Sequence, residues 1–168
     1  GGKFALITLE AFPERINEIF LLAPDGIKTN MWYRLATYPV ALRSLFKSMI
    51  KKPKRFDAFA HAAFRFGLID KGLLRFVELQ MNTEEKRNRV YHAWVVFRHL
   101  TVNPHTIASL INQHAIRLVM IIGKHDKVIT AKNMNTFLRH VKNHRLELPD
   151  TGHNGVIDAS INILKNKL

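Results

Sequence analysis

Three short apolar runs, each followed by turn residues, are divided between the two ends of this 168-residue chain. They extend from Ile16 to Ala23, from Arg117 to Gly123 and from Arg145 to Leu148. Nearly continuous apolar runs of this kind are typical of strands in a parallel sheet, because such strands are buried on both faces. Apolar residues at helical spacing follow the second and third runs, so we expect a parallel α/β fold of about three strands with flanking helices.

The long region between the first and second strands shows helical patterns and almost no strand pattern. At roughly 80 residues it is too long for an ordinary loop, so we expect an all-helical subdomain inserted into the sheet. The expected organisation is a core segment at 1–27, a helical cap at 28–115 and a second core segment at 116–168. The expected helices of the cap are 31–50, 57–66, 71–81, 84–100 and 106–114.

The charge of the chain is unevenly distributed. Lys and Arg outnumber Asp and Glu by 26 to 13, and from Lys28 to Asn103 the counts are 15 and 5. A basic surface attracts anionic molecules, so nucleic acid, an anionic membrane or an acidic partner would suit the cap. A solvated helical face explains the same charges without any partner. The densest basic residues are Lys47, Lys51, Lys52, Lys54 and Arg55.

Composition excludes several classes of site. The chain has no Cys, which removes disulfides, thiolate metal sites and a Cys nucleophile. His140 and His144 have the i, i+4 spacing of a metal pair, but we expect the helix to end between them, and no carboxylate completes a ligand set. We therefore expect no metal or other cofactor. No run approaches the length of a membrane span and no signal peptide is recognisable, so we expect a cytoplasmic protein.

Three motifs accompany the expected elements in a fixed order. Gly1 and Gly2 open the first helix, Asp126 follows the second strand within Gly-Lys-His-Asp, and His153 follows the third strand within Thr-Gly-His-Asn. This arrangement resembles the C-terminal part of an α/β-hydrolase of the esterase and lipase type that carries a helical cap. The nucleophile motif of that family is G-x-S-x-G-G, and Gly1 and Gly2 match only its last two positions.

The resemblance implies a hydrolase that cleaves a small carboxylic ester or related acyl compound with a Ser-Asp-His triad. His153 would be the general base and then the general acid, and Asp126 would hold its imidazole in the productive tautomer. The same pairing is reasonable without the family, because ligands of open α/β sheets bind outside the carboxyl ends of the strands. The Ser would lie two residues before Gly1, and the first strand would pair with the strand that leads into this Ser. We therefore expect the chain to be part of a longer protein whose N-terminal half is missing here.

Two alternatives remain open at this point. Asp25 follows the first strand, where some relatives with an Asp nucleophile carry their acid, although Pro-Asp-Gly is also an ordinary turn. The identity of the missing nucleophile, Ser or Asp, decides the type of reaction. His125 is expected to face solvent.

A second reading of the whole chain is a non-catalytic binding protein that uses the basic cap to bind anionic partners.

Overall fold

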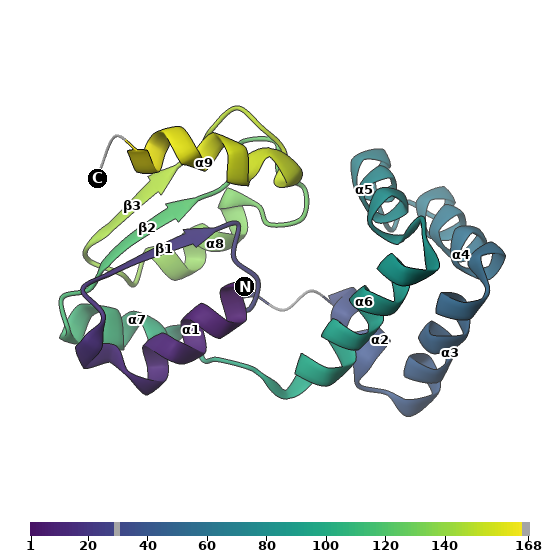
Figure 1. Ribbon diagram of the computed structural model, residues 1–168, viewed down its shortest axis with the longest axis horizontal. Coiled ribbons are helices and arrows are strands. Elements are labelled where there is room, and N and C mark those ends of the chain that lie inside the picture. The colour runs from purple at the N-terminus through teal and green to yellow at the C-terminus, as the bar shows by residue number, and fades with distance from the viewer. Residues whose placement is uncertain (29–30, 166–168) are drawn as a thin grey trace. The chain divides into compact units, whose positions relative to one another are not determined.

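The computed structural model of the chain describes residues 1–28 and 31–165 and divides into two compact units (Figure 1). Gly1–Lys28 and Leu100–Leu168 form an α/β unit, and Thr29–His99 forms a helical unit. The α/β unit contains the three expected strands, β1 (Glu18–Leu22), β2 (Arg117–Ile121) and β3 (His144–Glu147). They form a parallel sheet in the order β1-β2-β3.

The sheet is covered by helices on both faces, with β2 at its centre (Figure 1). The apolar side chains of β2 alternate between the faces: Leu118 and Met120 pack in one cluster, and Val119 and Ile121 pack in the other. Both sets are buried, which is why this strand has a continuous apolar sequence. The first cluster includes residues from α1 (Gly2–Ala11), α7 (Pro104–Gln113) and α8 (Ala131–Leu138), and the second includes residues from α9 (Val156–Lys165).

Short 3-10 helices join some of these elements. The first, Pro13–Arg15, lies between α1 and β1, and the second, His153–Gly155, leads into α9. Among the described strands β1 forms one edge of the sheet, because it pairs with β2 alone.

The helical unit consists of five α-helices in the part that the structure describes, followed by the 3-10 helix Phe97–His99. Phe46, Met49, Ile50, Phe56 and Met81 form its small core. The α-helices are α2 (Met31–Thr37), α3 (Val40–Lys51), α4 (Pro53–Arg65), α5 (Lys71–Met81) and α6 (Glu84–Val96).

The structure corrects three expectations about this region. The helix expected over 31–50 is two helices, because α3 begins only after Pro39. The helix expected from residue 57 starts at Pro53, which occupies its first turn. The helical unit ends at His99 rather than at residue 115, because α7 buries Ile107 and Ile111 in the core of the α/β unit.

The helices in the described ranges 1–28 and 31–165 include none that is both long and apolar enough to cross a bilayer.

Candidate active site

Asp126 lies in the loop that follows β2 and is held by a tight turn. Its backbone N–H donates to the Gly123 carbonyl at 3.0 Å. Its side chain is fully buried, and Oδ1 accepts hydrogen bonds from the backbone N–H groups of Val128 and Ile129 at 2.7 and 2.8 Å. These bonds stabilise a buried carboxylate and fix the direction in which Oδ2 points.

The imidazole of His153 is bound to the other oxygen of this carboxylate. His153 follows β3, begins a 3-10 helix and places Nδ1 at 2.7 Å from Asp126 Oδ2. Because an ionised carboxylate only accepts hydrogen bonds, Nδ1 must donate its proton to Asp126. Nε2 is then the ring nitrogen that can take a proton from another group. The side chain of His153 is 29% exposed, so substrate can approach it.

The two loops that carry these residues are bound to each other through their backbones. The Lys124 N–H donates to the Pro149 carbonyl at 2.9 Å, and the His125 N–H donates to the Thr151 carbonyl at 3.0 Å. A Cβ atom at Gly123 would lie 2.5 Å from the Thr151 carbonyl oxygen, which is closer than real Cβ atoms approach. Glycine at position 123 therefore permits the contact that brings Asp126 beside His153.

The alternative acid lies elsewhere in the α/β unit. Asp25 Oδ1 accepts a hydrogen bond from the Lys3 N–H at 3.1 Å, at the start of α1. The structure thus brings His153 together with Asp126, and it assigns Asp25 a contact with the first turn of a helix. His125, the neighbour of Asp126, is exposed and contacts Asp150 at 2.8 Å.

The two histidines considered as a metal pair do not share a helix. We expected the helix to end between His140 and His144, but α8 ends at Leu138, before both of them. The His140 ring packs edge-on against the His105 ring, and His144 Nδ1 lies 2.6 Å from the Val141 carbonyl. Within the described part of the chain, no group of three or more His, Asp or Glu side chains is arranged to hold a metal ion.

Sequence reasoning did not identify the amides of Val128 and Ile129 as partners of Asp126. A signal for them exists, because Asp in a turn commonly accepts hydrogen bonds from the backbone two and three residues later.

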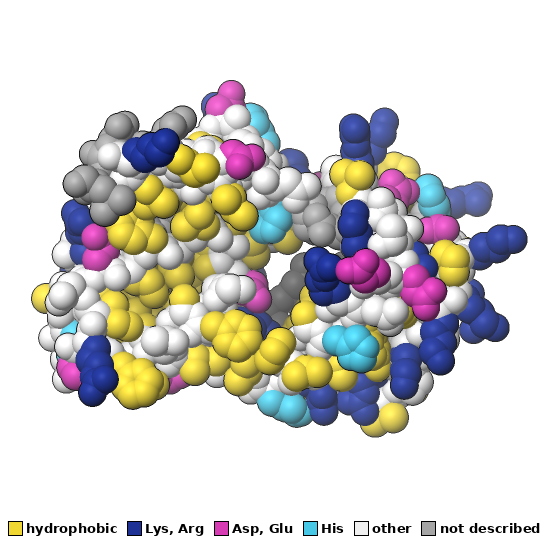
Figure 2. All heavy atoms as spheres, in the orientation of Figure 1, with side chains coloured by type: hydrophobic (Ala, Val, Ile, Leu, Met, Phe, Trp, Pro, Cys, Tyr) yellow, Lys and Arg dark blue, Asp and Glu magenta, His cyan; other side chains and the backbone are white. Residues whose placement is uncertain are grey.

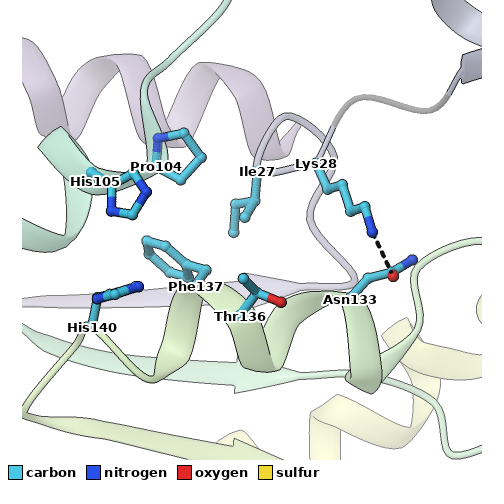
Figure 3. A pocket seen from close by; sticks show the side chains of 8 residues that line it. All are labelled: Ile27, Lys28, Pro104, His105, Asn133, Thr136, Phe137 and His140. Carbon is cyan, nitrogen blue, oxygen red and sulfur yellow. Dashed lines mark hydrogen bonds between the residues drawn. The ribbon is translucent and has the colours of Figure 1, made fainter.

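A cavity of about 260 Å³ lies in the α/β unit beside α8 and contains neither Asp126 nor His153 (Figure 3). Its apolar wall includes Ile27, Pro104 and Phe137, and Lys28 donates to Asn133 at its rim. This cavity is separate from the Asp126–His153 pair.

Comparison with solved structures places this geometry in a known fold. The sequence matches no protein-family model and no curated protein. The structure is similar to a thermophilic esterase from Thermogutta terrifontis, with a TM-score of 0.59 and 11% identity over 98% of this chain and 59% of that chain. A probable hydrolytic enzyme from Pseudomonas aeruginosa PAO1 matches with a TM-score of 0.55 and 14% identity over 99% and 59% of the two chains.

A third similar structure is 2-hydroxy-6-oxo-6-phenylhexa-2,4-dienoate hydrolase from Rhodococcus sp. strain RHA1. Its TM-score is 0.54, with 17% identity over 99% of this chain and 60% of that chain. This chain has the fold of an α/β-hydrolase. The expected fold class is therefore confirmed, and the chain spans about 60% of the length of the α/β-hydrolases that it matches.

All four serines of this chain lie within helices. Ser44 and Ser48 are in α3, Ser109 is in α7 and Ser160 is in α9. A triad serine instead lies on a sharp turn between a strand and a helix, where its hydroxyl is exposed to substrate. None of the four has this local structure.

Proposed function

We propose that the protein is a hydrolase that cleaves a carboxylic ester or related acyl compound, with His153 and Asp126 as two members of a Ser-His-Asp triad. The observation that carries this proposal is the 2.7 Å contact between His153 Nδ1 and the buried Asp126 carboxylate, after adjacent parallel strands. This is the contact that a general base and its orienting acid require. The α/β-hydrolase fold, and an esterase among the similar structures, agree with it.

In the proposed mechanism His153 moves the protons and Asp126 stays ionised. Nε2 of His153 takes the proton of the serine hydroxyl while the serine oxygen attacks the ester carbonyl. The tetrahedral intermediate breaks its bond to the leaving alcohol, which receives that proton from His153, and an acyl-enzyme remains. A water molecule then attacks the acyl group and gives one of its protons to Nε2 of His153. The bond between the acyl group and the serine oxygen breaks, the acid leaves, and His153 returns the proton to the serine.

The nucleophile is proposed to lie upstream of this chain. Gly1 and Gly2 match the end of G-x-S-x-G-G, and α1 begins at Gly2, as a helix after a nucleophile turn should. β1 is an edge of the described sheet. In the proposed enzyme the strand that leads into the serine pairs with β1.

The test is covalent labelling of the full-length protein with an alkyl fluorophosphonate, read by peptide mass spectrometry. The proposal predicts a stoichiometric adduct on one serine that precedes Gly1, and loss of p-nitrophenyl ester hydrolysis as the adduct forms. A single turnover in water labelled with a heavy oxygen isotope tests the alternative, which is an Asp nucleophile. Label incorporated into an Asp side chain, without a serine adduct, would replace the esterase assignment with an Asp-nucleophile reaction. Absence of both signals would contradict a hydrolase of either type.

A further inference from the structure

The exposed side of α4 combines apolar and basic side chains in one row. Phe56, Ala60 and Ala63 are its buried residues. Arg55, Phe59, Ala62 and Phe66 recur at intervals of four, three and four residues, so they lie on one stripe of the helix, and all four are exposed. Phe56, which belongs to the core of the helical unit, lies about a quarter turn around α4 from this stripe.

The C-terminal end of α4 carries the most protruding apolar side chain. Phe66 is 78% exposed and Leu68 is 56% exposed, on either side of Gly67. Gly67 has a φ of +68°, and the N–H of Leu68 donates to the Ala63 carbonyl at 2.9 Å. This is a hydrogen-bonded helix end that needs glycine, so the turn is well defined and still presents its two apolar residues to solvent. We call Phe66 and Leu68 the apolar tip.

Basic residues are concentrated at the N-terminal end of α4, at the other end of the helix from the apolar tip. Residues 40–56, which form α3 and the first turn of α4, contain six Lys and Arg residues and no Asp or Glu. Lys51, Lys52 and Lys54 are exposed where the two helices meet. Figure 2 shows Lys and Arg side chains spread over the helical unit with hydrophobic side chains exposed among them. Among the described residues, none of the ion pairs involves these three lysines.

From this combination we propose that the helical unit docks on an anionic lipid surface, with the apolar tip inserted between headgroups and the lysines of 40–56 bound to lipid phosphates. Exposed aromatic and aliphatic side chains beside Lys and Arg are the features of interfacial helices. The charge distribution argues against two other partners for this surface, a second copy of the chain and the rest of the same chain. A second copy of this basic unit would repel the first, and the rest of the chain holds 12 basic and 8 acidic residues, which is no complement to it. Leu68 and the apolar stripe favour lipid over nucleic acid, since only the aromatic members would stack on bases.

The experiment is flotation of the full-length protein with two kinds of vesicle, one of phosphatidylcholine alone and one in which about a third of the lipid is phosphatidylglycerol. The proposal predicts binding to the anionic vesicles that weakens steeply with salt. Changing both residues of the apolar tip to Ser should lower partitioning by about tenfold or more. Changing Lys51, Lys52 and Lys54 to Gln should lower it by about fivefold for each charge removed.

Matched variants in the α/β unit serve as controls. Ile157→Ser removes a side chain that is 67% exposed on α9, and Gln at the exposed Lys132, Lys142 and Lys165 removes the same net charge. These variants should bind vesicles as the unmodified protein does, and circular dichroism should show all variants folded. Equal binding to both vesicle types, or equal losses in test and control variants, would overturn the proposal. The proposal would also be overturned if the tip variants bound vesicles normally but hydrolysed a soluble ester at a changed rate. The apolar tip would then act on the α/β unit and not on lipid.

Binding to a single-stranded RNA with no binding to vesicles would also overturn it and would assign the basic surface to nucleic acid. Partitioning is measured without turnover, so this result does not depend on whether the protein is a hydrolase.

Discussion

Nδ1 of His153 lies 2.7 Å from Oδ2 of Asp126, although 27 residues separate the two in the sequence. The parallel pairing of β2 and β3 makes this contact, because it brings the loops after both strands to the same edge of the sheet. The other oxygen of Asp126 is already occupied by two backbone amides. The carboxylate is thus aimed at the imidazole before any substrate binds.

Asp126→Asn should preserve the shape of the site and remove its activity. The amide nitrogen of Asn would donate to Nδ1 and leave the proton on Nε2, where the nucleophile needs a base. In triads of this kind the change lowers kcat by about 10⁴-fold. Steady-state kinetics on a soluble p-nitrophenyl ester would measure it. Asp25→Asn is the matched control and should retain the activity of the unmodified enzyme, since Asp25 contacts α1. A larger loss for Asp25→Asn than for Asp126→Asn would reverse the assignment of the acid.

Gly123→Ala should separate the two loops that carry Asp126 and His153. The new Cβ would lie 2.5 Å from the Thr151 carbonyl oxygen and 3.0 Å from that of Gly152, both of them backbone atoms. Relief requires movement of the chain between Asp126 and His153, and a displacement of about 1 Å can cost on the order of 10²-fold in rate. Gly152→Ala is the control, because a Cβ there has no neighbour within 4 Å and its φ of −90° suits alanine. Similar kcat/KM values for the two variants would mean that the close approach at Gly123 does not position the site.

Arg87→Met should destabilise the helical unit. Arg87 is buried, and it donates from Nε to the Ile50 carbonyl and from Nη1 to the Met81 carbonyl, each at 3.0 Å. These carbonyls end α3 and α5, and losing both donors should cost about 1–3 kcal/mol of unfolding free energy. Chemical denaturation followed by tryptophan fluorescence would report it, because Trp94 packs against this core.

The neighbouring Arg89→Met provides the control for that measurement. Arg89 is exposed and pairs with Glu85 one turn away, a contact of about 0.3–0.5 kcal/mol. Equal stability losses for the two arginine variants would show that burial of Arg87 has no special role.

The strands could be predicted because strands buried on both faces have nearly continuous apolar sequences. Five consecutive apolar residues, Leu118 to Ile122, occupy β2 and the position directly after it and are all buried, as expected of a strand enclosed between two helical layers. The proximity of Asp126 and His153 could also be predicted, since each follows a strand of the same sheet. The sequence could not show how Asp126 is oriented, because hydrogen bonds to main-chain amides depend on loop geometry and not on the identities of Val128 and Ile129.

The helical unit was harder to predict. The sequence pattern predicts the helix α4 only from residue 57, but proline is well suited to the first turn of a helix, and α4 begins at Pro53. The unit to which α7 belongs was missed because an apolar face containing Ile107 and Ile111 indicates that a helix is packed, not which neighbour it packs on. Arg87 lies among charged residues that are typical of an exposed first turn, so its burial had no sequence signal.

The central claim is that His153 transfers protons during hydrolysis, and the most direct measurement is kcat of His153→Ala beside that of His125→Ala in the full-length protein. Both variants remove an imidazole from the same pair of loops, but His125 contacts the exposed Asp150, whereas His153 contacts the buried Asp126. The account predicts a loss of about 10⁴-fold or more for His153→Ala. For His125→Ala it predicts a kcat near that of the unmodified protein, and labelling of the same serine by the fluorophosphonate. Ester hydrolysis that persists in His153→Ala at a rate near that of the unmodified enzyme would contradict the account.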